Sequence, residues 1–193
     1  MSKQLCVFCA SSAKVHQDYF EATIRFANAA VDGGYSILYG GGALGLMGAL
    51  ADTAISKHGK VTGIIPDFMR SVEWDHKGIS ELIVVNDMRE RKKLLIEHAD
   101  AIVVLPGGSG TIEELFEAIS LKKLGMITIP IVILNQNGFY DSLEQLMEKM
   151  ISERFMRAEH RNIWTFVKTP EEIIPAVENA QPWSKDAIHF AAV

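Results

Sequence analysis

Long apolar segments and runs of one charge are both missing from this sequence of 193 residues. The longest apolar run, at positions 127–134, is broken by Pro130 and is too short to span a bilayer. The N-terminus lacks the basic region and the long apolar stretch of a signal peptide. The formal charge of −5, without an extended run of Lys or Arg, argues against a nucleic-acid partner. We therefore expect a cytoplasmic protein that binds neither a membrane nor nucleic acid.

Cysteine is scarce as well, because the chain has only two, Cys6 and Cys9. Their C-x-x-C spacing is found in redox and zinc sites. The surrounding segment, 4–9, has the apolar pattern of a strand, however, and residues three apart on a strand point to opposite faces. No further zinc ligands are evident near them, and a redox pair usually begins a helix. The sequence favours a structural role for both thiols and predicts neither a metal nor a cofactor.

Short apolar runs alternate with amphipathic segments along the chain. Expected strands lie at 4–9, 36–39, 61–65, 82–85, 101–105, 131–134 and 163–167. Expected helices lie at 19–31, about 49–57, 88–98 and 140–152, with two more that begin at Thr111 and after Thr169. This alternation predicts one α/β domain with a mostly parallel sheet flanked by helices. We expect the domain to span residues 1–180 and to be followed by a loose tail, 181–193, without clear periodicity.

Glycine gathers in one turn between a predicted strand, 101–105, and a predicted helix. The three glycines within 107–110 allow the backbone to turn tightly and to approach a ligand closely. Such a turn presents free N–H groups and the positive end of the helix dipole, which is typical of a phosphate site. Glu113 and Glu114 are expected in the first turn of the helix. Thr111-x-x-Glu114 fits a capping box as well as a catalytic carboxylate beside a phosphate, and the spacing leaves both interpretations open.

Two further loops, 10–12 and 40–42, follow predicted strands. Because ligands bind at the carboxyl ends of parallel strands, these loops and the glycine turn can face one crevice. Gly40-x-Gly42-x-x-Gly45 matches the dinucleotide fingerprint, but it follows the second strand and not the first. A second wall of a nucleotide pocket is therefore favoured over an NAD site.

The basic cluster at 89–93 also has two interpretations. Such clusters usually form a solvated helix face, but this one begins a helix just past a strand, where an Arg can bind phosphate or carboxylate.

The segment 67–78 is predicted to be an irregular loop, and its candidate lid or pocket residues are Phe68, Met69 and Trp74.

Two motifs together resemble the signature of the LONELY GUY family: Met88-x-x-Arg91-Lys92 and Pro106-Gly107-Gly108-x-Gly110-Thr111-x-Glu113-Glu114. Segments 6–12, 39–42, 45–48 and 76–78 also resemble blocks of that family, so the resemblance runs from about Leu5 to Asn162. The family comprises the cytokinin-activating phosphoribohydrolases and bacterial relatives long mislabelled as lysine decarboxylases. The resemblance implies a Rossmann-like, doubly wound sheet and a homodimer.

By this resemblance the protein hydrolyses the N-glycosidic bond of AMP or an N6-modified AMP, giving free base and ribose 5-phosphate. Arg91 and Glu114 are then the catalytic pair, and a carboxylate beside the ribose can indeed stabilise an oxocarbenium-like sugar and activate water. The implied substrate-binding residues are Glu73, Met88, Lys92, Gly107, Gly108, Ser109, Gly110, Thr111, Ile112, Glu113 and Ser120, with Ser12, Gly41 and Gly42 from the other loops. The rival interpretation is a non-catalytic carrier or sensor of a nucleotide or of the molybdenum cofactor on the same fold.

The sequence departs from the family pattern at several positions. Arg89 stands in place of a frequent His, and Ser109 stands in place of a frequent Tyr or Leu. Leu121-Lys122-Lys123 stands where a Trp and a Gln are frequent. These departures leave the preferred base, and hence the physiological substrate, open.

Overall fold

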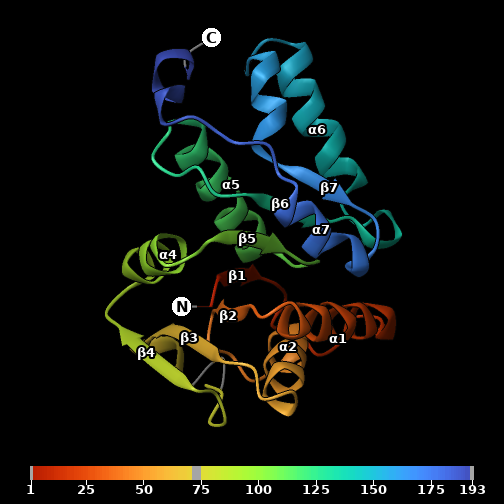
Figure 1. Ribbon diagram of the computed structural model, residues 1–193, viewed down its shortest axis with the longest axis vertical. Helices are drawn as coiled ribbons and strands as arrows, with labels where there is room; N and C mark the ends of the chain where they lie inside the picture. The colour runs from red at the N-terminus through yellow and green to blue at the C-terminus, as the bar shows by residue number, and fades with distance from the viewer. Residues whose placement is uncertain (1, 71–74, 192–193) are drawn as a thin grey trace.

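The computed structural model describes residues 2–70 and 75–191. Within them, seven strands form one sheet in the order β4-β3-β2-β1-β5-β6-β7, and every strand pairing is parallel (Figure 1). The strands are β1 (Gln4–Phe8), β2 (Ser36–Tyr39), β3 (Val61–Pro66), β4 (Glu81–Val85), β5 (Ala101–Val104), β6 (Ile131–Leu134) and β7 (Thr165–Val167). The predicted α/β class with a Rossmann-like parallel sheet is confirmed.

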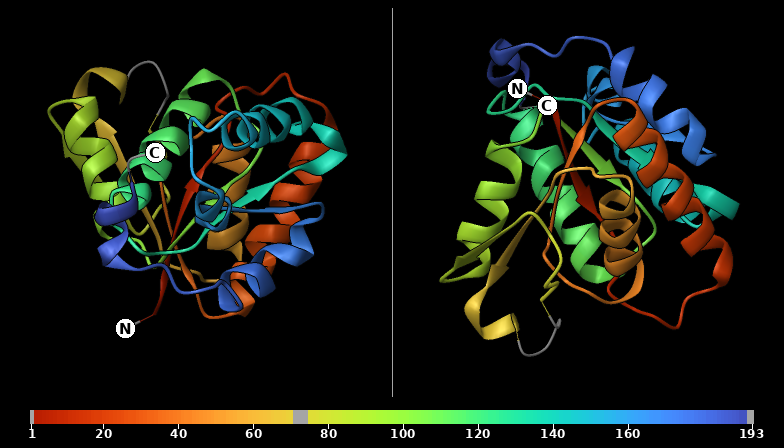
Figure 2. Two further views of the ribbon diagram at one scale, coloured as in Figure 1. Left: turned by 90° about the horizontal axis from the view of Figure 1, so that it is seen from above. Right: turned by 60° about the horizontal axis from the view of Figure 1, so that its bottom comes forward.

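Helices cover both faces of the sheet. They are α1 (Gln17–Asp32), α2 (Gly45–Ser56), α4 (Met88–Glu97), α5 (Ser109–Lys123), α6 (Asp141–Ser152) and α7 (Ile173–Glu178). Buried side chains of α1, α2 and α7 join one hydrophobic cluster and those of α4, α5 and α6 join another, so the sheet separates two helical layers. Figure 2 shows β1 running between α4 and α5 on one side and α1 and α2 on the other.

Within the described ranges, none of the helices combines the length and apolarity that a membrane crossing requires.

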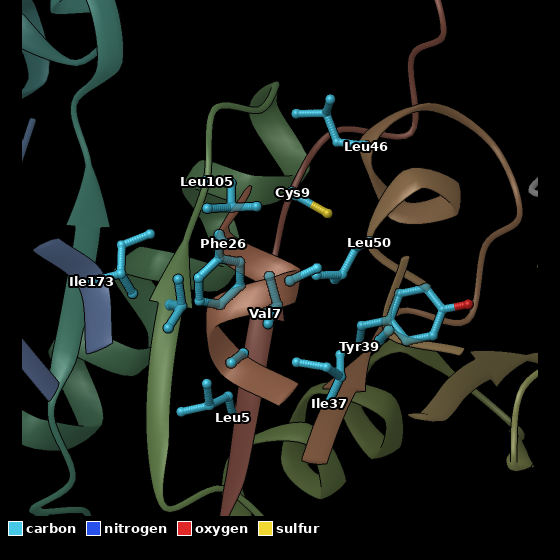
Figure 3. Close-up of a cluster of buried hydrophobic side chains, with 14 of the residues drawn as sticks. Leu5, Val7, Cys9, Phe26, Ile37, Tyr39, Leu46, Leu50, Leu105 and Ile173 are labelled. Atoms are coloured by element: carbon cyan, nitrogen blue, oxygen red, sulfur yellow. The ribbon is translucent and has the colours of Figure 1, made fainter. Parts of the chain in front are cut away.

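Alternation along β1 sends successive side chains into the two layers. Leu5, Val7 and Cys9 belong to the cluster formed with α1 and α2 (Figure 3). Cys6 and Phe8 belong to the cluster formed with α4 and α5. Complete burial of a Leu or Phe side chain stabilises a fold by roughly 1.5–3 kcal/mol, so this central strand contributes to both cores. The predicted opposite orientation of Cys6 and Cys9 is confirmed, and both are buried thiols outside any disulfide.

The strand order reverses between β1 and β5. β1 continues into α1 on one face and β5 into α5 on the other, so the two connections separate and leave a crevice at the carboxyl ends of these strands. Backbone hydrogen bonds hold the two loops together there. The N–H of Ala10 donates to the carbonyl of Pro106 (3.3 Å), and the N–H of Leu105 donates to the carbonyl of Phe8 (2.9 Å).

Several expected boundaries are wrong. α1 begins at Gln17 and not at residue 19, and α2 begins at Gly45 and not after Gly48. α5 begins at Ser109, with Gly108 as its N-cap, and not at Thr111. The last strand is shorter than expected because Ala158–Ile163 forms a 3-10 helix. The irregular segment expected after β3 begins with a 3-10 helix, Asp67–Met69.

The C-terminal segment packs against the end of α5, so the expectation of a loose tail is wrong for its described part. The indole Nε1 of Trp183 donates to the carbonyl of Lys122 (2.7 Å). A Cβ added at Gly125, whose φ is +71°, would lie 2.3 Å from the carbonyl oxygen of Lys185. The segment then forms a 3-10 helix, Lys185–Phe190, within which Ala187 is completely buried.

Candidate active site

A pocket of about 330 Å³ opens at the carboxyl ends of β1 and β5. The loop after β1, Gly40 after β2, two side chains of α4 and the beginning of α5 line it, so the three loops expected to share a crevice do meet there. Its size is within the range of small-molecule sites. Of the sequence-predicted residues, the lining includes Ser12, Met88, Arg91, Gly108, Ser109, Gly110, Thr111, Glu113 and Glu114.

The N-terminus of α5 forms one wall of the pocket. Gly108 is the N-cap and supplies no side-chain hydrogen bond, while the first N–H groups of a helix have no intrahelical acceptor. An added Cβ at Gly108 or Gly110 would meet nothing within 4 Å, so the protein's own packing does not require glycine at either position. At Gly107, by contrast, an added Cβ would lie 2.1 Å from Oγ1 of Thr111. Gly107 therefore serves the fold, whereas Gly108 and Gly110 leave the helix end open to an anion.

Glu114 does not take part in a capping box. Thr111 is the third residue of α5 and not its N-cap, and no acidic residue lies in the first turn, so the capping interpretation is wrong. The Glu114 side chain is 12% exposed, and its Oε1 lies 3.9 Å from Nη2 of Arg91. Burial, and after it the negative charge of Glu114, raises the pKa of the neighbouring Cys6 thiol well above its usual value. Glu114 is thus a shielded carboxylate that faces an arginine at the pocket wall.

Arg91 extends from α4 into the same pocket. Asp87 caps α4 by accepting hydrogen bonds from the N–H groups of Arg89 and Glu90, which places Arg91 on the first turn. The Nη1 of Arg91 lies 3.6 Å from Sδ of Met69 and 3.7 Å from Sδ of Met88, and thioethers are weak acceptors. The solvated-face interpretation of the basic cluster is therefore wrong for this buried guanidinium, whereas Arg89 is exposed.

The end of β2 makes room for this guanidinium. A Cβ added at Gly40 would lie 2.1 Å from Nη2 of Arg91. Any other residue at this position would displace the arginine, because Arg91 is buried and has little room to move.

Lys92 points away from the pocket and joins α4 to α5. Its ammonium bonds to Glu113 and to Glu117, the latter at 2.6 Å. Partial burial lowers the pKa of Lys92, but the hydrogen bonds and charges of the two carboxylates outweigh it and raise the pKa overall. Lys92 is not among the pocket-lining residues, although the half-exposed Glu113 is.

Several other predicted residues also lie outside the lining. Gly41, with a φ of +82°, packs against β3, where an added Cβ would lie 3.3 Å from Cβ of Ile65. Gly42 pairs with Asp75 in an isolated bridge. Both shape the chain beyond β2 and do not form the pocket wall. Ile112, Ser120 and Gly107 are likewise absent from the lining, and Glu73 and Trp74 lie outside the described residues.

The pocket also contains residues that sequence reasoning passed over. The sequence offered one indication for Gly40, which directly follows a predicted strand. It offered no indication that Cys9 and Met47 line the pocket. Met69 lines the pocket as expected, whereas Phe68 is 62% exposed and does not.

Over the described residues, no group of three or more His, Cys, Asp or Glu side chains is placed to hold a metal ion.

A second, apolar pocket of about 260 Å³ adjoins the first. The two share Ala10, Ser12 and Gly108. The remaining wall of the second pocket is Val15, Tyr19, Leu46, Pro106, Gly107 and Phe139. A ligand bound at the first pocket could therefore place an apolar group in the second.

Comparisons of the sequence point to one family. The model of a family described as possible lysine decarboxylase matches residues 47–177. A probable cytokinin riboside 5′-monophosphate phosphoribohydrolase of Oryza sativa subsp. japonica is 36% identical over 175 residues, which cover 91% of this chain and 78% of that protein. A cytokinin riboside 5′-monophosphate phosphoribohydrolase of Arabidopsis thaliana is 37% identical over 181 residues, which cover 93% of this chain and 83% of that protein.

Solved structures share the fold at lower identity. The molybdenum cofactor carrier protein of Chlamydomonas reinhardtii aligns with a TM-score of 0.73 at 17% identity, over 93% of this chain and 98% of that chain. The molybdenum cofactor binding protein of Rippkaea orientalis aligns with a TM-score of 0.69 at 17% identity, over 92% of this chain and 96% of that chain. At this identity the likeness concerns the fold alone.

Proposed function

This chain belongs to the LONELY GUY family, and from that membership we propose that it hydrolyses the N-glycosidic bond of AMP or of an N6-modified AMP. The products are the free base and ribose 5-phosphate. One observation carries the proposal. A shielded carboxylate, Glu114, faces a buried arginine, Arg91, beside the open N-terminus of α5 in a single pocket.

The 5′-phosphate binds at the N-terminus of α5. The N–H groups at the start of the helix donate to its oxygens, and the helix dipole favours its charge. Gly108 and Gly110 lack the side chains that would hold the oxygens away from the backbone. Arg91 adds a planar cation on the facing wall.

With the phosphate in place, the ribose lies near Glu114. The bond between the anomeric carbon and the base nitrogen breaks, and its electron pair leaves with the base, which gains a proton. Glu114 stabilises the positive charge that develops on the sugar and accepts a proton from the water that adds to the anomeric carbon. Positioned acid–base help of this kind is worth about 10²–10⁴-fold in rate. Arg91, 3.9 Å away, orients the carboxylate.

The adjoining apolar pocket has room for an apolar substituent of the substrate. Tyr19, Leu46 and Phe139 offer about 260 Å³ of apolar space next to the phosphate-binding loop. Burial of each methylene group of such a substituent contributes about 0.8 kcal/mol.

A carrier without turnover remains the alternative, and only its fold is supported by the solved relatives. The paired Arg91 and Glu114 favour an enzyme, because a carrier of a phosphorylated ligand need not place a carboxylate in its pocket. Repulsion between that carboxylate and a bound anion would weaken simple binding.

The test compares the release of free adenine from AMP and from adenosine, followed by chromatography. We expect kcat/KM for AMP to be higher by at least about 10²-fold, since each hydrogen bond to a charged phosphate contributes roughly 1.5–3 kcal/mol. Equal kcat/KM for the two substrates would contradict the phosphate site. Tight binding of AMP without any release of adenine would favour the carrier.

We also propose a homodimer, on the family resemblance. Two apolar side chains near the C-terminus of α5, Leu124 and Met126, are exposed in the single chain and would be covered more favourably by a second copy. Sedimentation equilibrium should give twice the chain mass of 21.4 kDa. A single-chain mass at micromolar concentration would contradict this.

A further inference from the structure

A buried lysine at the far end of α5 has no role in the proposed reaction. Lys122 is 2% exposed, in the last turn of the helix. Across residues 2–70 and 75–191, its Nζ has neither a hydrogen-bond acceptor nor an ion-pair partner, and the ring centroid of Trp183 is 6.0 Å away. The ring of Trp183 offers the ammonium a cation–π contact but no hydrogen-bond acceptor, so an acceptor supplied from outside the protein would stabilise it. Burial lowers the pKa of Lys122 to about 8.

Lys122 lines a cavity of about 100 Å³. The cavity lies where β6 and β7 begin, which is the end of the sheet opposite the candidate active site, and Ala180 and Gln181 close it from the C-terminal segment. Asn162 and Thr165 add polar groups to its wall. A polar space of this size holds several water molecules, or one ion of a few heavy atoms.

The charges around this cavity are positive. Arg161 lines it together with Lys122, and no Asp or Glu is among the lining residues. The nearest acid in contact with either cation is Glu148, which accepts from Nε of Arg161 (2.9 Å) and from its Nη2 (2.5 Å). That pairing does not use Nη1 of Arg161 and leaves Lys122 without a counter-charge.

We propose that this cavity is a second ligand site, which binds a small oxyanion such as phosphate, sulfate or a short carboxylate. The Lys122 ammonium is its central donor, with Arg161, Asn162 and Thr165 around it. The bound anion would neutralise the buried charge and would join the C-terminal segment to the end of α5. This inference does not depend on the proposed reaction, because the cavity lies about 20 Å along α5 from the phosphate-binding N-terminus.

The experiment follows the protonation of Lys122 itself. Protein labelled with ¹³C at lysine Cε is titrated with pH by NMR, in chloride and then with phosphate, sulfate or acetate at the same ionic strength. The Lys122 signal is assigned by its disappearance in Lys122→Met. We expect an oxyanion to raise the pKa of Lys122 by about one unit or more, as a close counter-charge does, and to leave the signal of Lys123 unchanged. The anion that acts at the lowest concentration identifies the ligand class.

Two variants separate the cavity from general salt effects. Arg161→Gln should weaken the response of Lys122 to the oxyanion several-fold, whereas Lys123→Met, on the adjacent residue, should preserve it. A Lys122 pKa that is indifferent to every oxyanion would overturn the proposal. So would a response that chloride reproduces or that all lysines share. A phosphate ion bound at the active site does not interfere, because the signal comes from Lys122 alone.

Discussion

Glu113 and Glu114 are neighbours in the chain but have different surroundings. The side chain of Glu114 is 12% exposed and faces Arg91, whereas that of Glu113 is 54% exposed and bonds to Lys92. A carboxylate shielded from water acts more strongly on a developing positive charge than an exposed one does. Glu114 is therefore the stronger candidate for the reacting group.

Glu114→Gln keeps the shape of the side chain and removes its charge. We expect kcat for adenine release to fall at least about 10²-fold, the lower end of the contribution of a positioned acid–base group. AMP affinity should persist, because the N-terminus of α5 and Arg91 still hold the phosphate. The free energy of unfolding should fall by no more than about 3 kcal/mol, the lower end of the range for breaking a buried ion pair, because the two groups are 3.9 Å apart. Kinetics, calorimetry and urea unfolding on one preparation measure all three.

Glu113→Gln is the matched control for this variant. It removes a charge one residue away and should lower kcat less than tenfold, since the carboxylate of Glu113 is occupied by Lys92. Full activity of Glu114→Gln, together with a large loss in Glu113→Gln, would transfer the catalytic role to Glu113.

At the scale of single elements, α5 serves two different environments. Its N-terminus is open to the active-site pocket, and its C-terminus buries Lys122 beneath the C-terminal segment. The cation is favoured there by the negative end of the helix dipole, but burial opposes it and lowers its pKa to about 8. The pKa of an unfolded lysine is about 10.4, so folding destabilises the protonated amine.

Lys122→Met should therefore stabilise the protein in an oxyanion-free buffer. At pH 7 the lysine is protonated in both states, and the wild type bears the full cost of burying the charge. Above pH 8 the folded state loses the proton while the unfolded state keeps it until about pH 10.4, so wild-type stability rises across this window. We expect the variant to be more stable by about 1–3 kcal/mol at pH 7, with the advantage shrinking towards pH 10.

Urea unfolding of the wild type, Lys122→Met and Lys123→Met at both pH values measures this effect. The Lys123→Met control should show no pH-dependent difference from the wild type. An advantage of Lys122→Met that is constant with pH would mean that better packing, and not the charge, causes it.

At the scale of the whole molecule, the site depends on contacts between elements distant in the chain. The strand order places the ends of β1, β2 and β5 side by side, and α4 packs against β3 and β4 in the layer that also holds α5. Only this arrangement brings Gly40 against the guanidinium of Arg91 and brings that guanidinium to Glu114.

Gly40→Ala tests that three-way contact. The added methyl group would lie 2.1 Å from Nη2 of Arg91, so the guanidinium must move. We expect kcat/KM for AMP to fall about 10²-fold, as a misplacement of about 1 Å does, while the melting temperature stays near that of the wild type. The double variant Gly40→Ala, Arg91→Ala should lose no more than Arg91→Ala alone, because both act through one side chain. Additive losses would show that Gly40 serves the fold separately.

The sequence by itself determined the kind and order of the elements. Apolar runs rich in β-branched residues and helical periodicity are local properties, so the strands at 36–39 and 131–134 were predicted with the observed bounds. The glycine turn before α5 and the opposed directions of Cys6 and Cys9 follow from equally local rules, and both are observed. The roles of the site residues near these turns, by contrast, were named from the resemblance of two motifs to the LONELY GUY family.

Tertiary structure alone decided what those residues contact. The spacing from Thr111 to Glu114 was ambiguous because a capping box depends on where the helix begins, and α5 begins at Ser109. Lys92 and Arg91 are adjacent in the sequence, yet one bonds to α5 and the other enters the pocket, because successive helix residues face different directions. The burial of Lys122 required Trp183, which lies 61 positions further along the chain. Such contacts depend on how separate elements pack, and the pattern within any one segment does not contain that information.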